Sequence, residues 1–203
     1  MSPLGPIDPS PYQGTEMFHE ANSPLHFNVL SFWQWAFSDL VTNATRGVLA
    51  EYLVAQALGV AKDRVREEWA PFDMVTANGI KVEVKSAAYI QAWQQKQLSR
   101  IIFRVPMTRA WNKHTNRQSN EARRQADVYV FALLAHADQR TLDSLDVCQW
   151  EFYVLPTSAL DGRARSQHSI TLPSLKKLAG DPVGYRVLRA AVAQAAGQQR
   201  SAQ

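Results

Sequence analysis

Cysteine is almost missing from this sequence, because Cys148 is the only one among its 203 residues. A single thiol excludes an intramolecular disulfide and any zinc site built on several thiolates. No apolar run approaches the roughly eighteen residues that a membrane-spanning helix needs, and the N-terminus lacks the basic and apolar regions of a secretory signal. These absences predict a reduced, cytoplasmic protein that is neither exported nor inserted into a membrane.

Charge also shows no strong bias, since 22 Lys and Arg stand against 18 Asp and Glu, for a formal net charge of +4. Such a mild basic excess permits nucleic acid binding without arguing strongly for it. The length suits one substantial core rather than two. We expect a single domain over residues 25–193, an N-terminal tail or strap over 1–24, and a C-terminal tail over 194–203 that frays.

The rest of the sequence alternates between helical and strand patterns. Helices are expected at 31–40 and 44–58, and the second should be buried because it is apolar around most of its circumference and ends at Gly59. Closing helices are expected at 172–178 and 183–195. Strands are expected at 64–69, in a hairpin over 72–86, and at 101–106, 128–135 and 150–155. The last three suit a central sheet, so helices flanking a mixed sheet make this an α/β protein.

The second strand of the hairpin has two different faces. Val82 and Val84 alternate with Glu83 and Lys85, which gives one apolar and one ionic face. Taken alone this pattern is weak evidence for a site. Its ordinary alternative is a solvated sheet face on which Lys81 and its neighbours form ion pairs.

The pairing register of the hairpin follows from its loop. If residues 77–79 form a three-residue loop with its glycine in the left-handed conformation, Asp73 lies opposite Glu83. The same register sets Phe72 and Met74 beside the two valines. A two-residue turn would instead set these apolar side chains against charged ones. We predict the three-residue loop, because it produces one uniformly apolar face that can be buried.

Two carboxylates directly opposed on neighbouring strands have Cβ atoms roughly 5 Å apart, so they repel one another unless a cation lies between them. Magnesium suits this position, since it takes a few carboxylate oxygens and keeps waters that leave room for a phosphate oxygen and an attacking water. Lys85 points to the same face as Glu83. Its ammonium can hold or help deprotonate that water and neutralise charge that develops at phosphorus.

Glu51 is a carboxylate on a helix face that ought to pack inward. Its helical neighbours, among them Gly47, Val48, Val54 and Ala55, are small or apolar. A buried carboxylate without a partner is costly, so Glu51 must find a cation, a water on a metal ion or a strong donor. The alternative to a catalytic role is a structural ion pair with Arg46 or another arginine.

This order of residues resembles the PD-(D/E)XK, or restriction-endonuclease-like, superfamily. The resemblance is carried by Glu51 on a leading helix, Asp73 in Pro-Phe-Asp, and the triplet Glu83-Val-Lys85. The proline and aspartate of the superfamily name are separated here by one residue, which such proteins commonly tolerate. The wider segments 83–93, 127–131 and 150–156 resemble a bacterial branch of the superfamily.

The resemblance implies a restriction-endonuclease-like core over about 40–190 and one or two Mg²⁺ ions, for which Mn²⁺ can substitute. The catalytic residues that it implies are Glu51, Asp73, Glu83 and Lys85. Metal binding falls to Asp73, Glu83, Val84 and Glu51. Dimers are frequent in the superfamily, so a homodimer is also expected by analogy.

Basic residues are concentrated in segment 96–124, where Glu121 is the only acid. Such a segment can follow a phosphate backbone, and aromatic side chains beside it can stack on a base. Its alternative is a solvated loop whose tryptophans anchor the core. The residues expected to touch nucleic acid are Ser86, Tyr89, Gln91, Trp93, Arg100, Arg109, Lys113 and Arg117.

These residues predict a Mg²⁺-dependent nuclease that hydrolyses phosphodiester bonds of DNA. One alternative is a protein that binds nucleic acid on the same fold without cutting it, which would have no need of opposed carboxylates facing a polyanion. A structural protein with a solvated sheet face is the other alternative. It would leave Glu51 unexplained.

Overall fold

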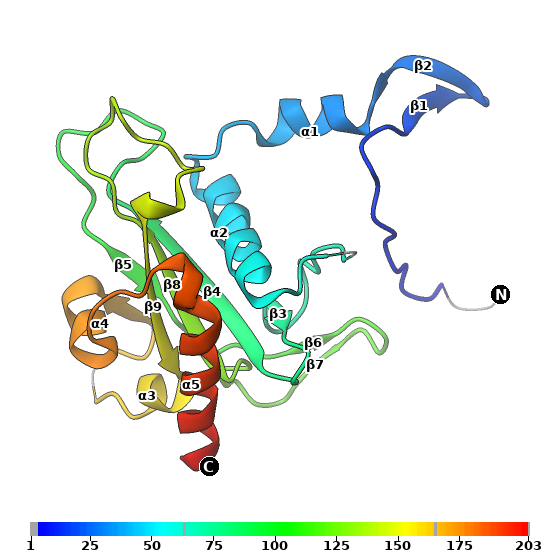
Figure 1. The fold of residues 1–203 in the computed structure, drawn as a ribbon. Helices are drawn as coiled ribbons and strands as arrows, with labels where there is room; N and C mark the ends of the chain where they lie inside the picture. Colours follow the sequence, from blue (N-terminus) through cyan, green and yellow to red (C-terminus); the bar gives the residue numbers. More distant parts are fainter. Residues whose placement is uncertain (1–3, 63, 165, 203) are drawn as a thin grey trace.

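A four-stranded mixed sheet in the order β3-β4-β8-β9 forms the centre of the computed structural model, which describes residues 4–62, 64–164 and 166–202 (Figure 1). The strands are Met74–Val75 (β3), Lys81–Ala88 (β4), Val128–Leu134 (β8) and Trp150–Pro156 (β9). β4 and β8 are parallel, whereas β3 pairs with β4, and β8 with β9, in antiparallel fashion. Helices flank this sheet, so the expected mixed α/β class is confirmed.

Each face of the sheet has its own hydrophobic core. Alternate strand residues such as Val82 and Val130 pack under the helices α2 (Asn43–Leu58) and α5 (Leu188–Ser201). On the opposite face, Phe131 and its neighbours pack against elements from the later part of the chain. Those elements are β5 (Ile102–Arg104), α3 (Thr157–Asp161), β10 (Ser169–Thr171) and α4 (Leu172–Ala179). The period of two along β4 and β8 therefore builds a three-layered body.

Helix α2 matches its expected bounds closely. It ends at Gly59, whose φ of +74° is left-handed and whose N–H bonds the carbonyls of the last turn, as a glycine cap does. Burial is less complete than expected, because Ala50 and Val54 are buried while Tyr52 on the outer face is 54% exposed. One face of α2 covers the sheet, and the outer face is exposed to solvent.

The hairpin has the predicted register. Met74 pairs with Val82, Gly79 has a φ of +78°, and the Thr76 N–H donates to the Ile80 carbonyl at 2.9 Å across the three-residue loop. The expectation for Phe72 was wrong. Because β3 begins only at Met74, the alternation does not extend back to Phe72, which packs against the opposite core with the Lys81 ammonium 5.7 Å from its ring centroid.

Several other expectations need correction. Residues 64–69 were expected as a strand, but their described positions form a loop. β5 lies outside the central sheet and pairs with β10. The expected fraying of 194–203 was also wrong over most of that range, since α5 continues to Ser201. Its last turns are held by burial of Ala195 and Ala196 against the sheet.

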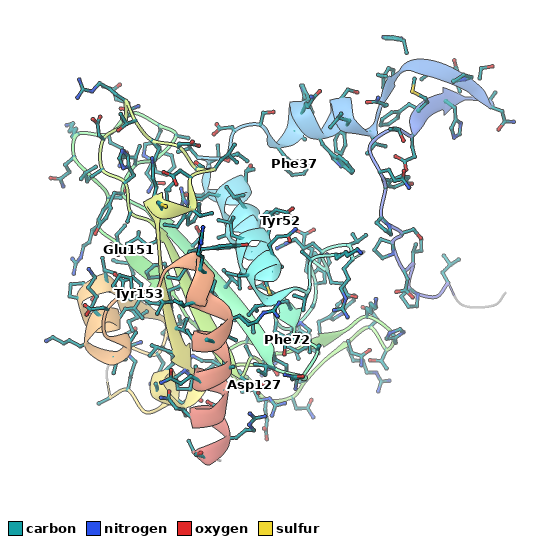
Figure 2. The ribbon with its side chains drawn as sticks, in the orientation of Figure 1. Phe37, Tyr52, Phe72, Asp127, Glu151 and Tyr153 are labelled. Atoms are coloured by element: carbon teal, nitrogen blue, oxygen red, sulfur yellow. The ribbon has the colours of Figure 1, made fainter. Side chains whose placement is uncertain are left out.

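The remaining short elements are β6 (Trp111–Asn112) and β7 (Arg117–Gln118), which form a small hairpin, and the 3₁₀ turns Val147–Gln149 (η1) and Tyr185–Val187 (η2). Before α2 the chain forms β1 (Met17–Glu20), β2 (Ser23–Asn28) and α1 (Val29–Phe37), which project from the body (Figure 1). Figure 2 shows Phe37 out on this projection, well apart from the core side chain Tyr153. Among the described helices, none is both long enough and apolar enough to cross a membrane.

Candidate active site

Asp73 and Glu83 meet at the start of the hairpin. The pairing of β3 with β4 ends at Met74 and Val82, and Asp73 lies one residue before it, where the charges of Glu83 and Lys85 act on its carboxyl. The Asp73 N–H donates to the Val82 carbonyl at 3.1 Å, and the Val84 N–H donates to the Asp73 carboxylate at 2.6 Å. The Asp73 side chain is therefore fixed by the main chain of β4 at the edge of the sheet.

The environment of Asp73 opposes its negative charge. Burial, followed by the charges of Glu83 and Glu51, raises the pKa of its carboxyl to about 7, against the lowering effects of the Val84 N–H and Lys85. Three carboxylates thus influence one another at this position. Crowding of this kind is typical of sites that bind a cation or handle a proton.

Lys85 and Glu83 form a contact within the site. The Lys85 ammonium donates to the Glu83 carboxylate at 2.5 Å, and the two side chains are 30% and 18% exposed. Register sets Glu83 beside Tyr129 of β8, and burial together with the Glu83 charge raises the pKa of the tyrosine hydroxyl. The two side chains are partly buried, and their ion pair is one that the alternative of an ionic sheet face also predicted.

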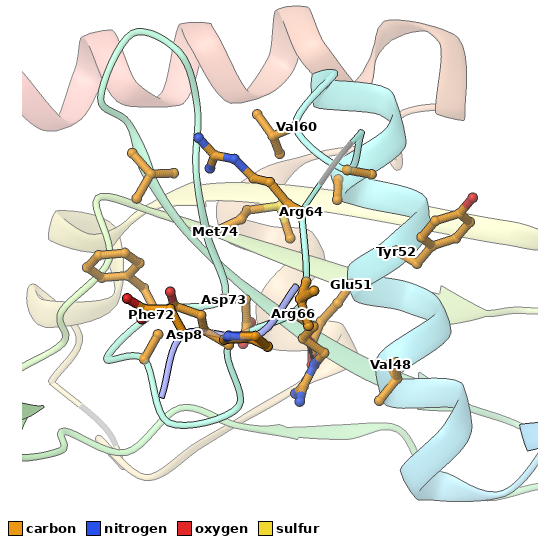
Figure 3. A pocket seen from close by; sticks show the side chains of 17 residues that line it. Asp8, Val48, Glu51, Tyr52, Val60, Arg64, Arg66, Phe72, Asp73 and Met74 are labelled. Atoms are coloured by element: carbon orange, nitrogen blue, oxygen red, sulfur yellow. Dashed lines mark hydrogen bonds and ion pairs between the residues drawn. The ribbon is translucent and has the colours of Figure 1, made fainter. Parts of the chain in front are cut away.

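Glu51 forms an ion pair with Arg66, which is the pairing with another arginine that the structural alternative predicted. The guanidinium donates from Nε at 2.5 Å and from Nη2 at 2.9 Å to the two carboxylate oxygens. Figure 3 shows both side chains close to Asp73. Arg46, which the sequence also offered, instead donates to the Val41 carbonyl at 2.8 Å and is 4% exposed.

Arg66 was not among the predicted site residues. It comes from the loop that connects α2 to Asp73, fifteen positions after Glu51. The only hint in the sequence was that two arginines, Arg64 and Arg66, precede Pro71-Phe-Asp. Because neither lies in a helix or strand, their spacing could not predict which residues they contact. Folding of the loop brings Arg66 to Glu51.

Among the described residues, no three His, Cys, Asp or Glu side chains form a group that could hold a metal ion. Asp73, Glu83 and Lys85 come together as predicted. Glu51 lies near enough to affect the pKa of Asp73, yet its carboxylate is turned to Arg66. The arrangement is therefore a pair of neighbouring carboxylates with a lysine, flanked by a second ion pair.

Val84 can contribute only through its main chain. Its side chain is 6% exposed and belongs to the core under α2. Its N–H points to Asp73, and the N–H and carbonyl of one strand residue point to the same side. The Val84 carbonyl oxygen therefore faces the strand edge where Asp73 lies.

A cavity of ≈ 690 Å³ lies beside this edge (Figure 3). Glu51, Asp73 and Arg66 line it together with apolar residues of α2 such as Val48 and Tyr52. Glu83 and Lys85 are not among the lining residues. Asp73 is thus the point where the cavity meets the charged pair on β4, and a ligand in the cavity would approach the site from the side of Glu51 and Arg66.

Three of the residues expected to touch nucleic acid serve the interior instead. Gln91 is 9% exposed, and its amide donates to the Ala88 carbonyl at 2.8 Å and accepts from Arg46. Ser86 accepts from Arg46 at 3.4 Å, and Tyr89 packs against the core. The bonds from Arg46 to Ser86 and Gln91 tie the end of β4 to α2.

The other five predicted residues are divided between two regions. Trp93 and Arg100 follow the far end of β4, where Trp93 is 57% exposed. The remaining three, Arg109, Lys113 and Arg117, lie in or beside the β6–β7 hairpin.

The β6–β7 hairpin adjoins the loop that leads to Asp73. Trp111 meets Trp69 edge to face at 6.2 Å between ring centroids, and Lys113 pairs with Asp8 at 2.8 Å and with Glu67 at 3.6 Å. Of the two basic regions, this one is therefore next to the candidate site.

Comparison with known proteins locates the chain in one family. No curated protein matches it. The family model of bacteriophage T4 endonuclease IV, however, matches residues 29–168, a span that contains Glu51, Asp73, Glu83 and Lys85. The match covers more than half of the chain. The chain therefore belongs to the bacteriophage T4 endonuclease IV family, a family of nucleases.

Proposed function

We propose that this chain is a Mg²⁺-dependent endonuclease that hydrolyses phosphodiester bonds of DNA with the chemistry of the PD-(D/E)XK superfamily. The observation that carries the proposal is the proximity of the Asp73 and Glu83 carboxylates, with Lys85 in contact with Glu83, inside the span that matches a nuclease family. Opposed carboxylates facing a polyanionic substrate require a cation between them.

The donor set fits magnesium. Asp73 and Glu83 supply carboxylate oxygens from two strands, and the Val84 carbonyl faces the same edge. Magnesium is usually held by one or two carboxylates and keeps several waters, so two acidic residues suffice. When bound, the ion would polarise the scissile phosphate and lower the pKa of a water. Mn²⁺ would replace it, since it accepts the same oxygen ligands.

Lys85 acts on the reacting groups in this proposal. Its ammonium already contacts Glu83, so it is held beside the metal ligands at the face where phosphate would bind. From there it orients the attacking water and offsets negative charge at phosphorus in the transition state. A neutral side chain at this position would supply neither effect.

Arg66 and Glu51 form the wall of the site toward the cavity. The pair keeps Glu51 beside Asp73, and a second ion bound there would take the place of Arg66 at the Glu51 carboxylate. The planar guanidinium of Arg66 also matches a phosphate group, which it can bind with two parallel hydrogen bonds. Arg66 therefore links substrate binding in the cavity to the carboxylates.

The basic residues beside the β6–β7 hairpin would hold the DNA backbone. Arg109 and Arg117 are exposed, and Lys113 is bonded to Asp8 and Glu67 at the border of the loop that leads to Asp73. Backbone contacts of this kind weaken as the salt concentration rises, because the release of counterions from DNA on binding then contributes less free energy. Binding should therefore fall steeply with ionic strength, whereas cleavage chemistry at saturating DNA should not.

The decisive test is cleavage of a panel of duplex, branched and single-stranded DNA with Mg²⁺, Mn²⁺ or EDTA. We expect metal-dependent cleavage that Asp73→Asn and Glu83→Gln abolish while the circular dichroism spectrum is unchanged. Asp138→Asn is the matched control, because it also removes one carboxylate, from an exposed pair with Arg140. If Asp73→Asn cuts as fast as the parent, the assigned site is wrong.

One observation favours a second candidate, a protein that binds DNA without cutting it. Among the described residues no three acidic, histidine or cysteine side chains form a metal-binding group. This alternative predicts salt-sensitive binding in fluorescence anisotropy, tighter binding when Glu83→Gln removes a negative charge, and no cleavage with any metal. Cleavage by the parent together with loss in Glu83→Gln excludes it.

A further inference from the structure

We propose that the N-terminal arm, defined as residues 14–37, is a dimerisation element that packs against the same arm of a second copy of this chain. The arm contains β1, β2 and α1 and projects from the body (Figure 1). Its structure is organised, its surface is apolar, and its size matches that of a protein interface.

The arm is held in shape by its own contacts. The Leu30 N–H donates to the Gly14 carbonyl at 2.9 Å, which ties the start of α1 to the irregular segment before the hairpin. Asn28 caps α1 by accepting from the Ser31 N–H at 3.0 Å, and Ser31 accepts in return from the Asn28 N–H. Gly14 has a φ of +95°, and a Cβ there would lie 3.2 Å from the Trp33 ring. The arm is thus preformed.

The arm nevertheless has no core of its own. No residue of α1, all of which the structure describes, is buried. A single hairpin or a helix of nine residues is marginal in water, and units far below forty residues usually need outside support. Apart from Ser31 and Gln34, every residue of α1 is apolar, and an apolar helix face of this kind is normally covered. The covering surface must come from outside the arm.

The exposed apolar surface of the arm has the size of a dimer interface. Its large apolar side chains are from 36% to 86% exposed, and they are Met17, Phe18, Phe27, Leu30, Phe32, Trp33, Trp35 and Phe37. At about 200 Å² for a large side chain, they present on the order of 700 Å². An ordinary interface buries about 800 Å² on each partner, and the largest patch on a monomer is about 300–600 Å².

The charges of the arm select a second arm rather than nucleic acid. All 22 Lys and Arg residues of the chain lie at Arg46 or later, so the arm has no lysine or arginine for a phosphate backbone. Its acids, Glu16 and Glu20, lie in or before the hairpin, and α1 carries no charged residue. Two α1 helices related by a two-fold axis can therefore meet without burying or opposing charges.

The test is light scattering of the full chain after size exclusion, over a wide range of protein concentration. We expect the parent at twice the single-chain mass of 22.8 kDa, and Phe32→Glu/Trp35→Glu at half the parent value. Leu145→Glu is the matched control, since it places a glutamate at a body position that is 70% exposed, and it should stay dimeric. A monomeric parent, or a dimeric double variant, overturns the proposal.

Cross-linking distinguishes contact between two arms from contact between an arm and a partner's body. In a Cys148→Ser background, Gln34→Cys places the only thiol on α1. A short bismaleimide should join two chains through Gln34→Cys, and it should fail when Phe32→Glu/Trp35→Glu are added. A dimer by mass that gives no cross-linked product overturns the arm-to-arm arrangement. Unchanged circular dichroism of each variant shows that the body remains folded.

Discussion

The body and the N-terminal arm of this chain each contain a largely apolar segment, and the two segments are covered to opposite degrees. β8, with the sequence VYVFALL, is buried at all seven positions, whereas α1, with the sequence VLSFWQWAF, has no buried residue among those described. β8 lies between two strands and is covered on both faces, while α1 lies against no layer of its own chain. Apolar composition thus marks a segment to be covered without saying what covers it.

The comparison implies that stability lies in the body, and Phe131→Ala in β8 tests this most strongly. Phe131 is 0% exposed and meets Phe103 edge to face at 5.1 Å between ring centroids. Removing a buried aromatic ring leaves a cavity and costs about 3–5 kcal/mol of unfolding free energy. Urea denaturation in dilute solution measures it. A loss under about 1 kcal/mol would mean that the layer over this face is loosely packed.

Catalysis should also reside in the body. Lys85→Ala should reduce the single-turnover cleavage rate by about 10²–10³-fold, because it removes charge stabilisation at phosphorus. The melting temperature should change little, since Lys85 is 30% exposed and contacts an acid that remains partly solvated. Lys81→Ala is the matched control, being a neighbouring lysine on an exposed position of the same strand. Equal cleavage by the two variants would remove Lys85 from the mechanism.

Asp73 should lower the stability of the metal-free body in a pH-dependent way. Its pKa is raised from 3.8 to about 7 in the folded state, so the folded protein retains a proton that the unfolded chain has lost. The destabilisation grows as the pH rises from 3.8 to about 7, and it is complete above this range. Asp73→Asn should therefore be more stable than the parent by about 1–2 kcal/mol at alkaline pH in EDTA, and the advantage should shrink on acidification.

Metal separates this effect from a simple packing change. Mg²⁺ should stabilise the parent at alkaline pH, because it binds the ionised carboxylates of the folded state, and should have little effect on Asp73→Asn. Thermal denaturation with and without Mg²⁺ checks both statements. An advantage of Asp73→Asn that is independent of pH would mean that carboxylate repulsion is not its cause.

Arg66, which lies in the body beside the cavity, should affect both stability and cleavage, but less than Phe131 or Lys85 does. Arg66→Ala should cost about 0.5–1 kcal/mol, since it leaves the half-buried Glu51 carboxylate without its partner. Cleavage should fall about 10-fold through weaker substrate binding if Arg66 contacts phosphate. Arg66→Lys should restore most of the stability and less of the cleavage, because a lysine lacks the planar fork. Michaelis–Menten analysis separates the loss of substrate binding, seen in KM, from any loss of kcat.

The smallest effect should come from the arm. Trp35 is 86% exposed, so Trp35→Ala should change the unfolding free energy of dilute protein by less than about 0.5 kcal/mol. At high concentration the same variant should lose the extra stability that dimer formation gives the parent. Unfolding monitored at two concentrations measures both. A large loss in dilute solution would place the arm against its own body.

Local patterns predicted those parts of the fold that depend on neighbouring residues. The end of α2 at Gly59 and the hairpin loop at Gly79 follow from left-handed glycines, and the pairing of Met74 with Val82 follows from a period of two. The same reasoning failed where an element was shorter than expected. Phe72 lies before β3 begins, and β5 pairs with β10, a strand that the sequence pattern did not indicate.

The candidate site divides along the same line. Asp73, Glu83 and Lys85 lie within one hairpin. The alternation of side chains along a strand and the left-handed conformation of Gly79 were therefore enough to predict that they lie close together. The partner of Glu51 was not predictable, because Arg66 reaches it through a loop without periodicity. The burial of Gln91 was equally hidden, since it depends on contacts to α2 and to Ser99.

By itself the sequence determined one apolar and one ionic face of a strand, the hairpin register that pairs Met74 with Val82, and an uncharged aromatic helix near the N-terminus. Only the tertiary structure decided that Arg66 pairs with Glu51, that Phe72 joins the second core, and that α1 is left uncovered by its own body. The physical reason is the distance along the sequence over which each effect acts. Side-chain alternation and backbone handedness act between neighbours, whereas the covering of a surface depends on elements distant in sequence.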